Sequence, residues 1–193
     1  FRVFFRVRQC VSVSVIACDA PCSTVERLNT YTKDVSRMKS LDQVIANPGL
    51  RLTLGTAQFG MPYGVANRVG QPSYSQVRDI IRTAYENGID TLDTAAAYGE
   101  SEDVIGKALT ELNLTEEVMV VTKIAPMPAD ITPSGARKWV EDHLHTSRQK
   151  LGVDALPLVL LHRECDYAAA KEHLVCAVQK GTLLRSGVAG GNY

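Results

Sequence analysis

From residue 51 onward, short apolar runs alternate with longer stretches in which apolar residues recur every three or four positions. The short runs are typical of strands, and the longer stretches are typical of amphipathic helices. Strand and helix alternate throughout, which predicts a parallel sheet built from βαβ units. We expect strands at residues 52–57, 89–93, 117–124, 156–162 and 183–189, and helices at about 73–87, 101–112, 132–151 and 166–180.

Residues at the helix ends support these boundaries. Ser73 and Gln76 have the spacing of a capping box, and Thr132 with Pro133 resembles an N-cap followed by a first-turn proline. Glycine follows the last periodic residue of three helices, as is typical of C-terminal caps. These glycines are Gly88, Gly152 and Gly181.

Two architectures fit a parallel sheet of this kind, an open doubly wound sheet and a (β/α) barrel. The run EVMVVTKI at 117–124 is almost continuously apolar, as expected of a strand covered on both faces. The G-x-G-x-x-G fingerprint of a dinucleotide-binding open sheet does not follow the first strand. The barrel is therefore favoured, although periodicity alone leaves both architectures open.

Residues 1–50 differ from the rest of the chain. The stretch FRVFFRVRQCVSVSVIACDAPCS begins with several Arg and has no acidic residue before Asp19. A signal peptide or an organelle transit peptide fits this pattern, and so does the tail of an upstream segment, which we favour because the chain starts with Phe1 rather than Met. We expect an N-terminal extension at 1–50, a domain at 51–193, and a chain that is a fragment at both ends.

Composition narrows the function classes. The chain has 193 residues, of which 45% are hydrophobic and 22% charged, with 21 Lys and Arg balancing 21 Asp and Glu. This fits a soluble globular protein and gives no sign of a nucleic-acid partner. No apolar run approaches the ~20 residues that span a bilayer. Five cysteines, at 10, 18, 22, 165 and 176, match no zinc spacing, so we expect no metal and a reduced, cytoplasmic setting.

Ionisable residues gather at the predicted carboxyl ends of three successive strands, where parallel α/β folds place their chemistry. Asp93 ends the second strand, and Tyr98 follows in the loop. Lys123 lies at the end of the third strand and His162 directly after the fourth. Singly, each has a structural explanation, such as a loop-binding carboxylate or a lysine that reaches solvent from the rim. Together they indicate a site, because charged residues rarely end successive buried strands without partners.

The four side chains suit proton transfer to a carbonyl oxygen. A phenol has an ordinary pKa of about 10, and a nearby ammonium such as Lys123 lowers that pKa. Asp93 could supply the counter-charge that keeps a buried Lys123 protonated. Tyr98 is then a candidate proton donor to a developing alkoxide, and His162 could orient the same oxygen. A bound nicotinamide would complement this set as a hydride source.

Four segments resemble the aldo-keto reductase family in order and spacing. They are LGTAQFG at 54–60, LDTAAAYGESEDVIGKAL at 92–109, VVTKI at 120–124 and LGVDALPLVLLHRE at 151–164. The resemblance covers about residues 51–193 and implies an α/β fold, a (β/α)8 TIM barrel of which about the first five β/α units are present. It also implies reduction of an aldehyde or ketone with NADP(H) or NAD(H).

The resemblance further implies roles for individual residues. Asp93, Tyr98, Lys123 and His162 match the catalytic set, and Gly55, Thr56 and Asp93 match positions near the cofactor. The segment LGTAQFGMPYGVAN at 54–67 is similar to the corresponding segment of bacterial members found with surface-polysaccharide genes. This resemblance makes a sugar or nucleotide sugar a candidate substrate. The chain departs from the family at positions 189 and 190, where Ala and Gly replace a Ser and an Asn that hold the nicotinamide carboxamide. A non-catalytic, cofactor-sensing or partner-binding barrel, or an inactive fragment, remains an alternative.

Overall fold

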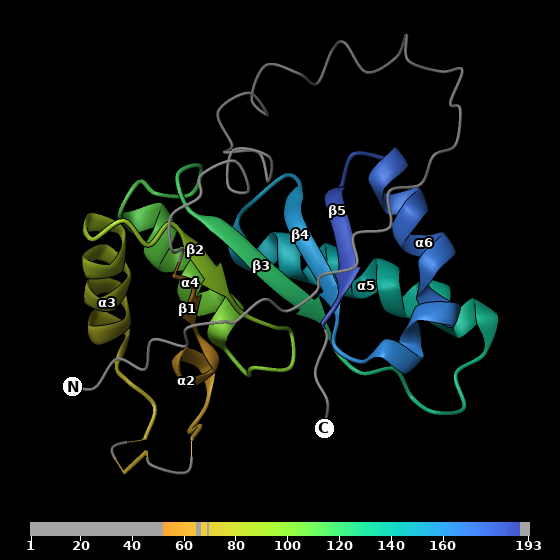
Figure 1. Cartoon of the computed structure of the whole chain (residues 1–193), viewed down its shortest axis with the longest axis horizontal. Coiled ribbons are helices and arrows are strands. Elements are labelled where there is room, and N and C mark those ends of the chain that lie inside the picture. Colours follow the sequence, from red (N-terminus) through yellow and green to blue (C-terminus); the bar gives the residue numbers. More distant parts are fainter. Residues whose placement is uncertain (1–51, 65–66, 69, 190–193) are drawn as a thin grey trace, which may run out of the picture.

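The computed structural model describes residues 52–64, 67–68 and 70–189, so the extension expected at 1–50 lies outside the described residues. Within these ranges five strands form one sheet in which every neighbouring pair is parallel. The strands are β1 (Leu54–Gly55), β2 (Thr91–Asp93), β3 (Met119–Ile124), β4 (Leu156–Leu161) and β5 (Leu183–Val188). Their order in the sheet is their order in the sequence (Figure 1). A doubly wound sheet reverses its strand order at a switch point, so this unbroken order is that of a barrel.

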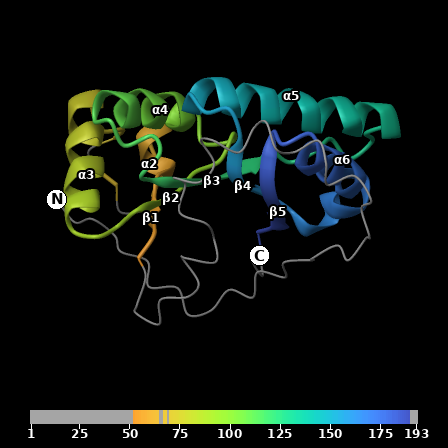
Figure 2. The same cartoon turned by 90° about the horizontal axis from the view of Figure 1, so that it is seen from above.

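The helices lie along one face of this sheet. They are α2 (Ala57–Gly60), α3 (Tyr74–Glu86), α4 (Ser101–Glu111), α5 (Pro133–Leu151) and α6 (Tyr167–Gln179), with a 3-10 turn, η3 (Glu164–Asp166), before α6. Figure 2 shows α3 to α6 as an arc around one side of the strands. Helices on a single face are the outer layer of a (β/α) barrel, which confirms the favoured architecture.

The predicted caps are present. The Ser73 backbone N–H donates to Oε1 of Gln76 over 2.9 Å, and the Gln76 backbone N–H donates to Oγ of Ser73, which is the capping box. Thr132 accepts the backbone N–H of Gly135 over 3.1 Å at the start of α5. Gly152 ends α5 with φ of +69°, in the left-handed region that favours glycine. The helix boundaries therefore lie within two residues of their predicted positions.

The first strand is shorter than predicted. It pairs with β2 only at Leu54 and Gly55, whereas residues 57–60 form the helical turn α2. Thr56 leaves the extended conformation, with φ of −117° and ψ of 12°. Its backbone N–H and its hydroxyl both donate to the Asp93 carbonyl, over 3.0 and 2.9 Å. These bonds hold the end of the strand to β2, and the chain turns at Thr56, whose carbonyl accepts the backbone N–H of Phe59 over 2.9 Å. The strand predicted over 52–57 was therefore wrong at its carboxyl end.

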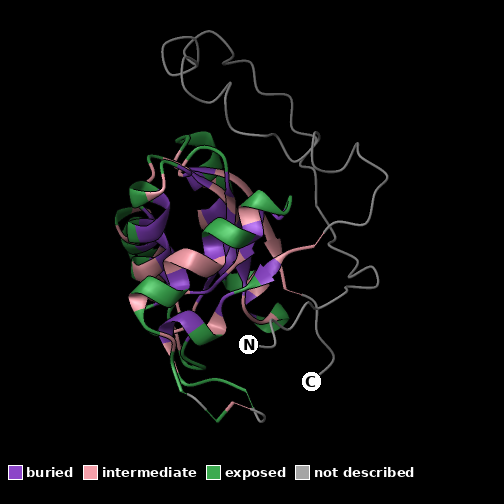
Figure 3. Cartoon of the chain, turned by 90° about the vertical axis from the view of Figure 1, so that its left-hand side faces the viewer, coloured by how far each residue is buried: buried purple, intermediate pink, exposed green. Residues whose placement is uncertain are grey.

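The hydrophobic core lies between the sheet and the helices. Its largest fully buried side chains include Ile81 on α3, Leu92 on β2 and Ile105 on α4. In Figure 3 the buried residues gather between the strands and the inner sides of the helices, and the outer sides of the helices are exposed. This packing fixes the strand ends relative to one another, and the loops that carry the candidate site begin at those ends.

Candidate active site

The four predicted catalytic residues lie at the carboxyl ends of three adjacent strands. Asp93 is the last residue of β2, and Tyr98 is in the loop between β2 and α4. Lys123 is next to last in β3, and His162 directly follows β4. In the register of the sheet, Asp93 pairs with Val121 and Lys123 with Leu160. The fold therefore delivers all four side chains to one edge of the sheet.

Lys123 and Asp93 form an ion pair across β2 and β3. The Lys123 Nζ atom lies 2.5 Å from Oδ1 of Asp93, and it also donates to the Thr94 carbonyl over 2.8 Å. The Lys123 side chain is only 6% exposed, and that of Asp93 is 21% exposed. A buried ammonium is tolerated only with a counter-charge and further hydrogen bonds, and this site supplies both.

Tyr98 completes the cluster beside the ion pair. The Lys123 Nζ atom lies over the Tyr98 ring, 5.2 Å from its centroid. The rings of Tyr98 and His162 meet edge to face, with centroids 6.1 Å apart and planes at 89°. The structure therefore brings together Asp93, Tyr98, Lys123 and His162 as the sequence predicted, with the Lys123 ammonium paired to the carboxylate and lying over the Tyr98 ring.

The surroundings of His162 favour its neutral imidazole form. Burial lowers its pKa below the usual 6.5, and the Lys123 ammonium lowers that pKa further. Among the described residues its Nδ1 atom is buried and has no hydrogen-bond partner. A neutral ring at pH 7 can act as a hydrogen-bonding group toward a carbonyl oxygen without adding a second positive charge beside Lys123.

We expect the His162 ring to titrate below its ordinary pKa of about 6.5. Because the unfolded chain then binds the proton more readily, the contribution of His162 to stability is present above that ordinary pKa. It is lost as the pH falls through the lowered pKa of the folded protein. An NMR titration of the imidazole carbon-bound protons, assigned with a His162→Gln variant, measures the pKa of His162 directly. A midpoint at or above the ordinary value would contradict the structure.

The residues predicted near the cofactor occupy two different environments. Gly55 is exposed and pairs with Asp93 in the sheet, and within the described part of the chain a Cβ atom added there would meet no other residue within 4 Å, its chain neighbours aside. Thr56 is fully buried, and its hydroxyl donates to the Asp93 carbonyl. Gly55 is thus an exposed neighbour of Asp93 in the sheet, whereas Thr56 holds the main chain of Asp93 through a hydrogen bond from its buried hydroxyl.

Two further polar residues at this corner were not predicted from the sequence. Thr94 and Ser101 are fully buried, and the Thr94 hydroxyl donates to Oγ of Ser101 over 3.0 Å. The Ser101 hydroxyl donates to the Thr56 carbonyl over 3.0 Å. The signal for them is weak: they are hydroxyl residues at the two ends of a short small-residue segment, which resemble ordinary loop residues.

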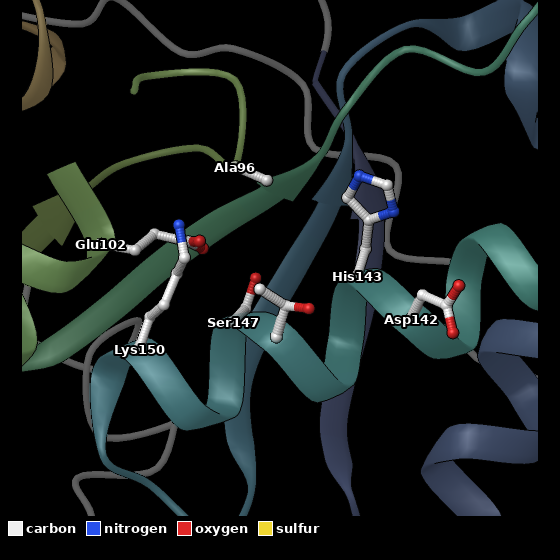
Figure 4. A pocket seen from close by; sticks show the side chains of 7 residues that line it. Ala96, Glu102, Asp142, His143, Ser147 and Lys150 are labelled. Atoms are coloured by element: carbon white, nitrogen blue, oxygen red, sulfur yellow. The ribbon is translucent and has the colours of Figure 1, made fainter. Parts of the chain in front are cut away.

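A separate cavity lies on the helix side of the sheet, between α4 and α5, with a volume of about 180 Å³. Figure 4 shows Glu102, Ser147 and Lys150 among the side chains around it, and none of the four candidate catalytic residues lines it. Glu102 is almost fully buried there, and its Oε1 atom accepts the hydroxyl of Thr122 over 2.6 Å. This bond ties α4 to β3 on the face opposite Lys123.

The described part of the chain contains no group of three or more His, Cys, Asp or Glu residues arranged to hold a metal ion. In the same part of the chain, no helix combines the length and the apolar character needed to cross a membrane.

Comparison with known proteins identifies the family. The profile of the Aldo/keto reductase family matches residues 51–192, most of the 193 residues. The chain belongs to the aldo/keto reductase family. The sheet with its arc of helices is accordingly about five units of this family's (β/α)8 barrel.

Three similar aldo-keto reductases or oxidoreductases show how far the likeness extends. D-arabinose 1-dehydrogenase from Saccharomyces cerevisiae is 29% identical over 147 residues, which is 72% of this chain and 42% of that protein. Aldo-keto reductase str7 from Strobilurus tenacellus is 33% identical over 116 residues, covering 58% of this chain and 32% of that protein. The Bombyx mori aldo-keto reductase in complex with NADP is 28% identical with a TM-score of 0.55, covering 74% of this chain and 47% of that chain.

The aldo/keto reductase chain described here thus spans less than half the length of these three proteins. The family and the fold expected from the sequence are confirmed by the matches. The roles of Asp93, Tyr98, Lys123 and His162, and those of Gly55 and Thr56, remain predictions that rest on the geometry described above.

Proposed function

We propose that the protein reduces an aldehyde or ketone to an alcohol with NADP(H) as cofactor, and that Tyr98 donates the proton. The observation that carries the proposal is the position of Lys123, which is paired with Asp93 and lies over the Tyr98 ring. A buried ammonium near a phenol favours loss of the phenolic proton, which is the step that carbonyl reduction requires of the protein.

Each polar side chain has one task in this scheme. The Tyr98 hydroxyl passes its proton to the carbonyl oxygen of the substrate as negative charge develops there. The Lys123 ammonium stabilises the phenolate that remains, and Asp93 keeps Lys123 protonated. His162, neutral and edge to face with Tyr98, provides a ring hydrogen bond that orients the same oxygen.

The cofactor would lie beside the end of β1. When bound, NADPH supplies the hydride that the carbonyl carbon accepts. Gly55 supports this placement, because among the described residues no atom outside Gly55 and its chain neighbours lies within 4 Å of a Cβ placed there. Thr56 would act indirectly, since its buried hydroxyl holds the main chain of Asp93. The similarity to an aldo-keto reductase in complex with NADP supports this assignment.

A sugar or a nucleotide sugar is the substrate class that we propose to test first. The similarity to D-arabinose 1-dehydrogenase supports an aldose as substrate, and the sequence of residues 54–67 supports a sugar of surface polysaccharides. A reduced, cytoplasmic setting, expected from the scattered cysteines, agrees with a nicotinamide-dependent enzyme and stays a prediction.

The test combines cofactor binding with turnover. The protein that carries these 193 residues is titrated with NADPH and with NADH by fluorescence, and oxidation of each is followed with a simple aromatic aldehyde and with several aldoses. Binding together with turnover supports the proposal. Binding without turnover on any carbonyl compound would favour the cofactor-sensing or partner-binding alternative. A chain that binds neither cofactor and melts without a cooperative transition would contradict the proposal and favour an inactive fragment.

A further inference from the structure

A tight backbone contact joins the turn after β1 to the loop that carries Tyr98. Gly60, the last residue of α2, and Gly99, which follows Tyr98, lie against each other. A Cβ atom at Gly60 would be 1.9 Å from the Tyr98 carbonyl oxygen and 2.2 Å from the Ser101 nitrogen. One at Gly99 would be 2.3 Å from the Gly60 carbonyl oxygen. These atoms belong to the main chain and cannot rotate aside, so neither position has room for a side chain.

Gly99 has a second reason to be glycine. Its φ is +59°, in the left-handed region that other residues adopt only with strain. This conformation turns the chain directly after Tyr98 and leads into α4, where the Ser101 backbone N–H donates to the Tyr98 carbonyl over 3.1 Å. The Glu100 backbone N–H donates to the Gly60 carbonyl over 3.3 Å across the contact. A hydrogen bond between the two segments therefore accompanies their close contact.

Buried hydroxyl groups hold the other side of the same loop. Thr56, Thr94 and Ser101 are each fully buried, and they connect the ends of β1 and β2 to the start of α4. Since Thr56 also donates to the Asp93 carbonyl, the network includes the strand end that holds Lys123. The loop over residues 94–100 is thus fixed at its base by hydroxyl groups and at its tip by the two glycines.

We infer that Gly60 and Gly99 are positioning residues that hold the Tyr98 phenol against Lys123 and His162, so that the turn after β1 sets the place of the proton donor. The inference rests on the proposed function, and it extends that function to a segment outside the catalytic set. Displacing a reacting group by about 1 Å can lower a rate about 10²-fold. The overlap that a methyl group at Gly60 would create is of that size, since ordinary contacts of Cβ atoms begin at 3.4 Å.

The test is the Gly60→Ala variant with Gly106→Ala as its matched control. A Cβ atom at Gly106 would lie 2.0 Å from the Lys150 carbonyl oxygen, so it creates a similar overlap, but between α4 and α5. We expect both variants to melt at a lower temperature. Only Gly60→Ala should lower kcat, by about 10²-fold, with little change in the Kd for NADPH. Equal effects of the two variants on kcat, or an unchanged kcat in Gly60→Ala, would overturn the inference.

A second readout is independent of catalysis. The Tyr98 ring lies edge to face with His162, so its ring current influences the NMR shifts of the imidazole protons. These shifts should move in Gly60→Ala and stay in place in Gly106→Ala. Unmoved shifts in Gly60→Ala contradict the inference even if the wild-type protein is active. A wild-type protein without turnover contradicts the proposed function and leaves this readout intact.

A milder variant covers the case in which Gly60→Ala does not fold. Ser101→Ala removes the hydroxyl that donates to the Thr56 carbonyl and adds no atoms. It should move the His162 proton shifts in the same direction, with a smaller loss of kcat. If Ser101→Ala folds and leaves both the shifts and kcat unchanged, the loop is not held as we infer.

Discussion

We expect the Tyr98→Phe variant to lose about 10²- to 10⁴-fold in kcat, the usual contribution of a positioned general acid. Phe keeps the ring that lies under Lys123 Nζ and beside His162, so the packing of the site should be preserved. The change removes only the hydroxyl. The Kd for NADPH and the melting temperature should therefore stay close to those of the wild-type protein, and the loss should appear in kcat rather than in KM.

The measurement is steady-state oxidation of NADPH with an aldehyde, alongside cofactor titration and thermal melting. Tyr85→Phe is the matched control, because Tyr85 is a partly buried tyrosine on α3 and lies outside the candidate site. Its kcat should not change. Turnover by Tyr98→Phe at the wild-type rate would show that the proton comes from another group, and the proposed mechanism would then be wrong.

The second large effect is expected for Lys123→Met, which should lower both activity and stability. Removal of the ammonium takes away the positive charge that is paired with the Asp93 carboxylate. Breaking a buried ion pair in this way costs about 3 kcal/mol or more, and we expect the lower figure because Asp93 is 21% exposed. The same change deprives the Tyr98 phenolate of its stabilising charge, so kcat should fall at least as far as in Tyr98→Phe.

Lys138→Met provides the comparison for stability. Lys138 pairs with Asp142 over 2.7 Å on the surface of α5, with 76% and 59% of the two side chains exposed. Exposed pairs one helical turn apart contribute about 0.3–0.5 kcal/mol, so denaturant unfolding should hardly distinguish this variant from the wild type. Equal losses of stability in the two lysine variants would mean that the Lys123–Asp93 pair is not buried as the structure places it.

The pattern of the sequence was sufficient for the features that depend on local rules. The capping box at Ser73 and the C-terminal glycine at Gly152 follow from interactions between residues a few positions apart, and both are present. The four candidate catalytic residues could also be predicted from the sequence, because a parallel sheet places the carboxyl ends of its strands on one edge. Their roles stay predictions, but their meeting point follows from topology alone.

Other features depend on contacts between segments far apart in the chain. The two bonds that anchor the end of β1 join Thr56 to the Asp93 carbonyl, 37 residues away. The contact between Gly60 and Gly99 joins the helical turn α2 to the loop that carries Tyr98, and either glycine could be an ordinary turn residue when seen alone. Periodicity reports only neighbours within a strand or a helix, so interactions of this kind appear only once the elements are packed.

The bond between Thr122 and Glu102 has a consequence for the folding of β3. Successive side chains of a strand point to opposite faces, so Thr122 meets α4 on one side and Lys123 meets Asp93 on the other. A shift of one residue along the sheet would place the ammonium among the helices and the threonine at the strand-end edge. Both polar bonds would be lost at once, one of them an ion pair. Two adjacent residues thus select a single alignment of this strand, and the alignment that they select is the one that assembles the candidate site.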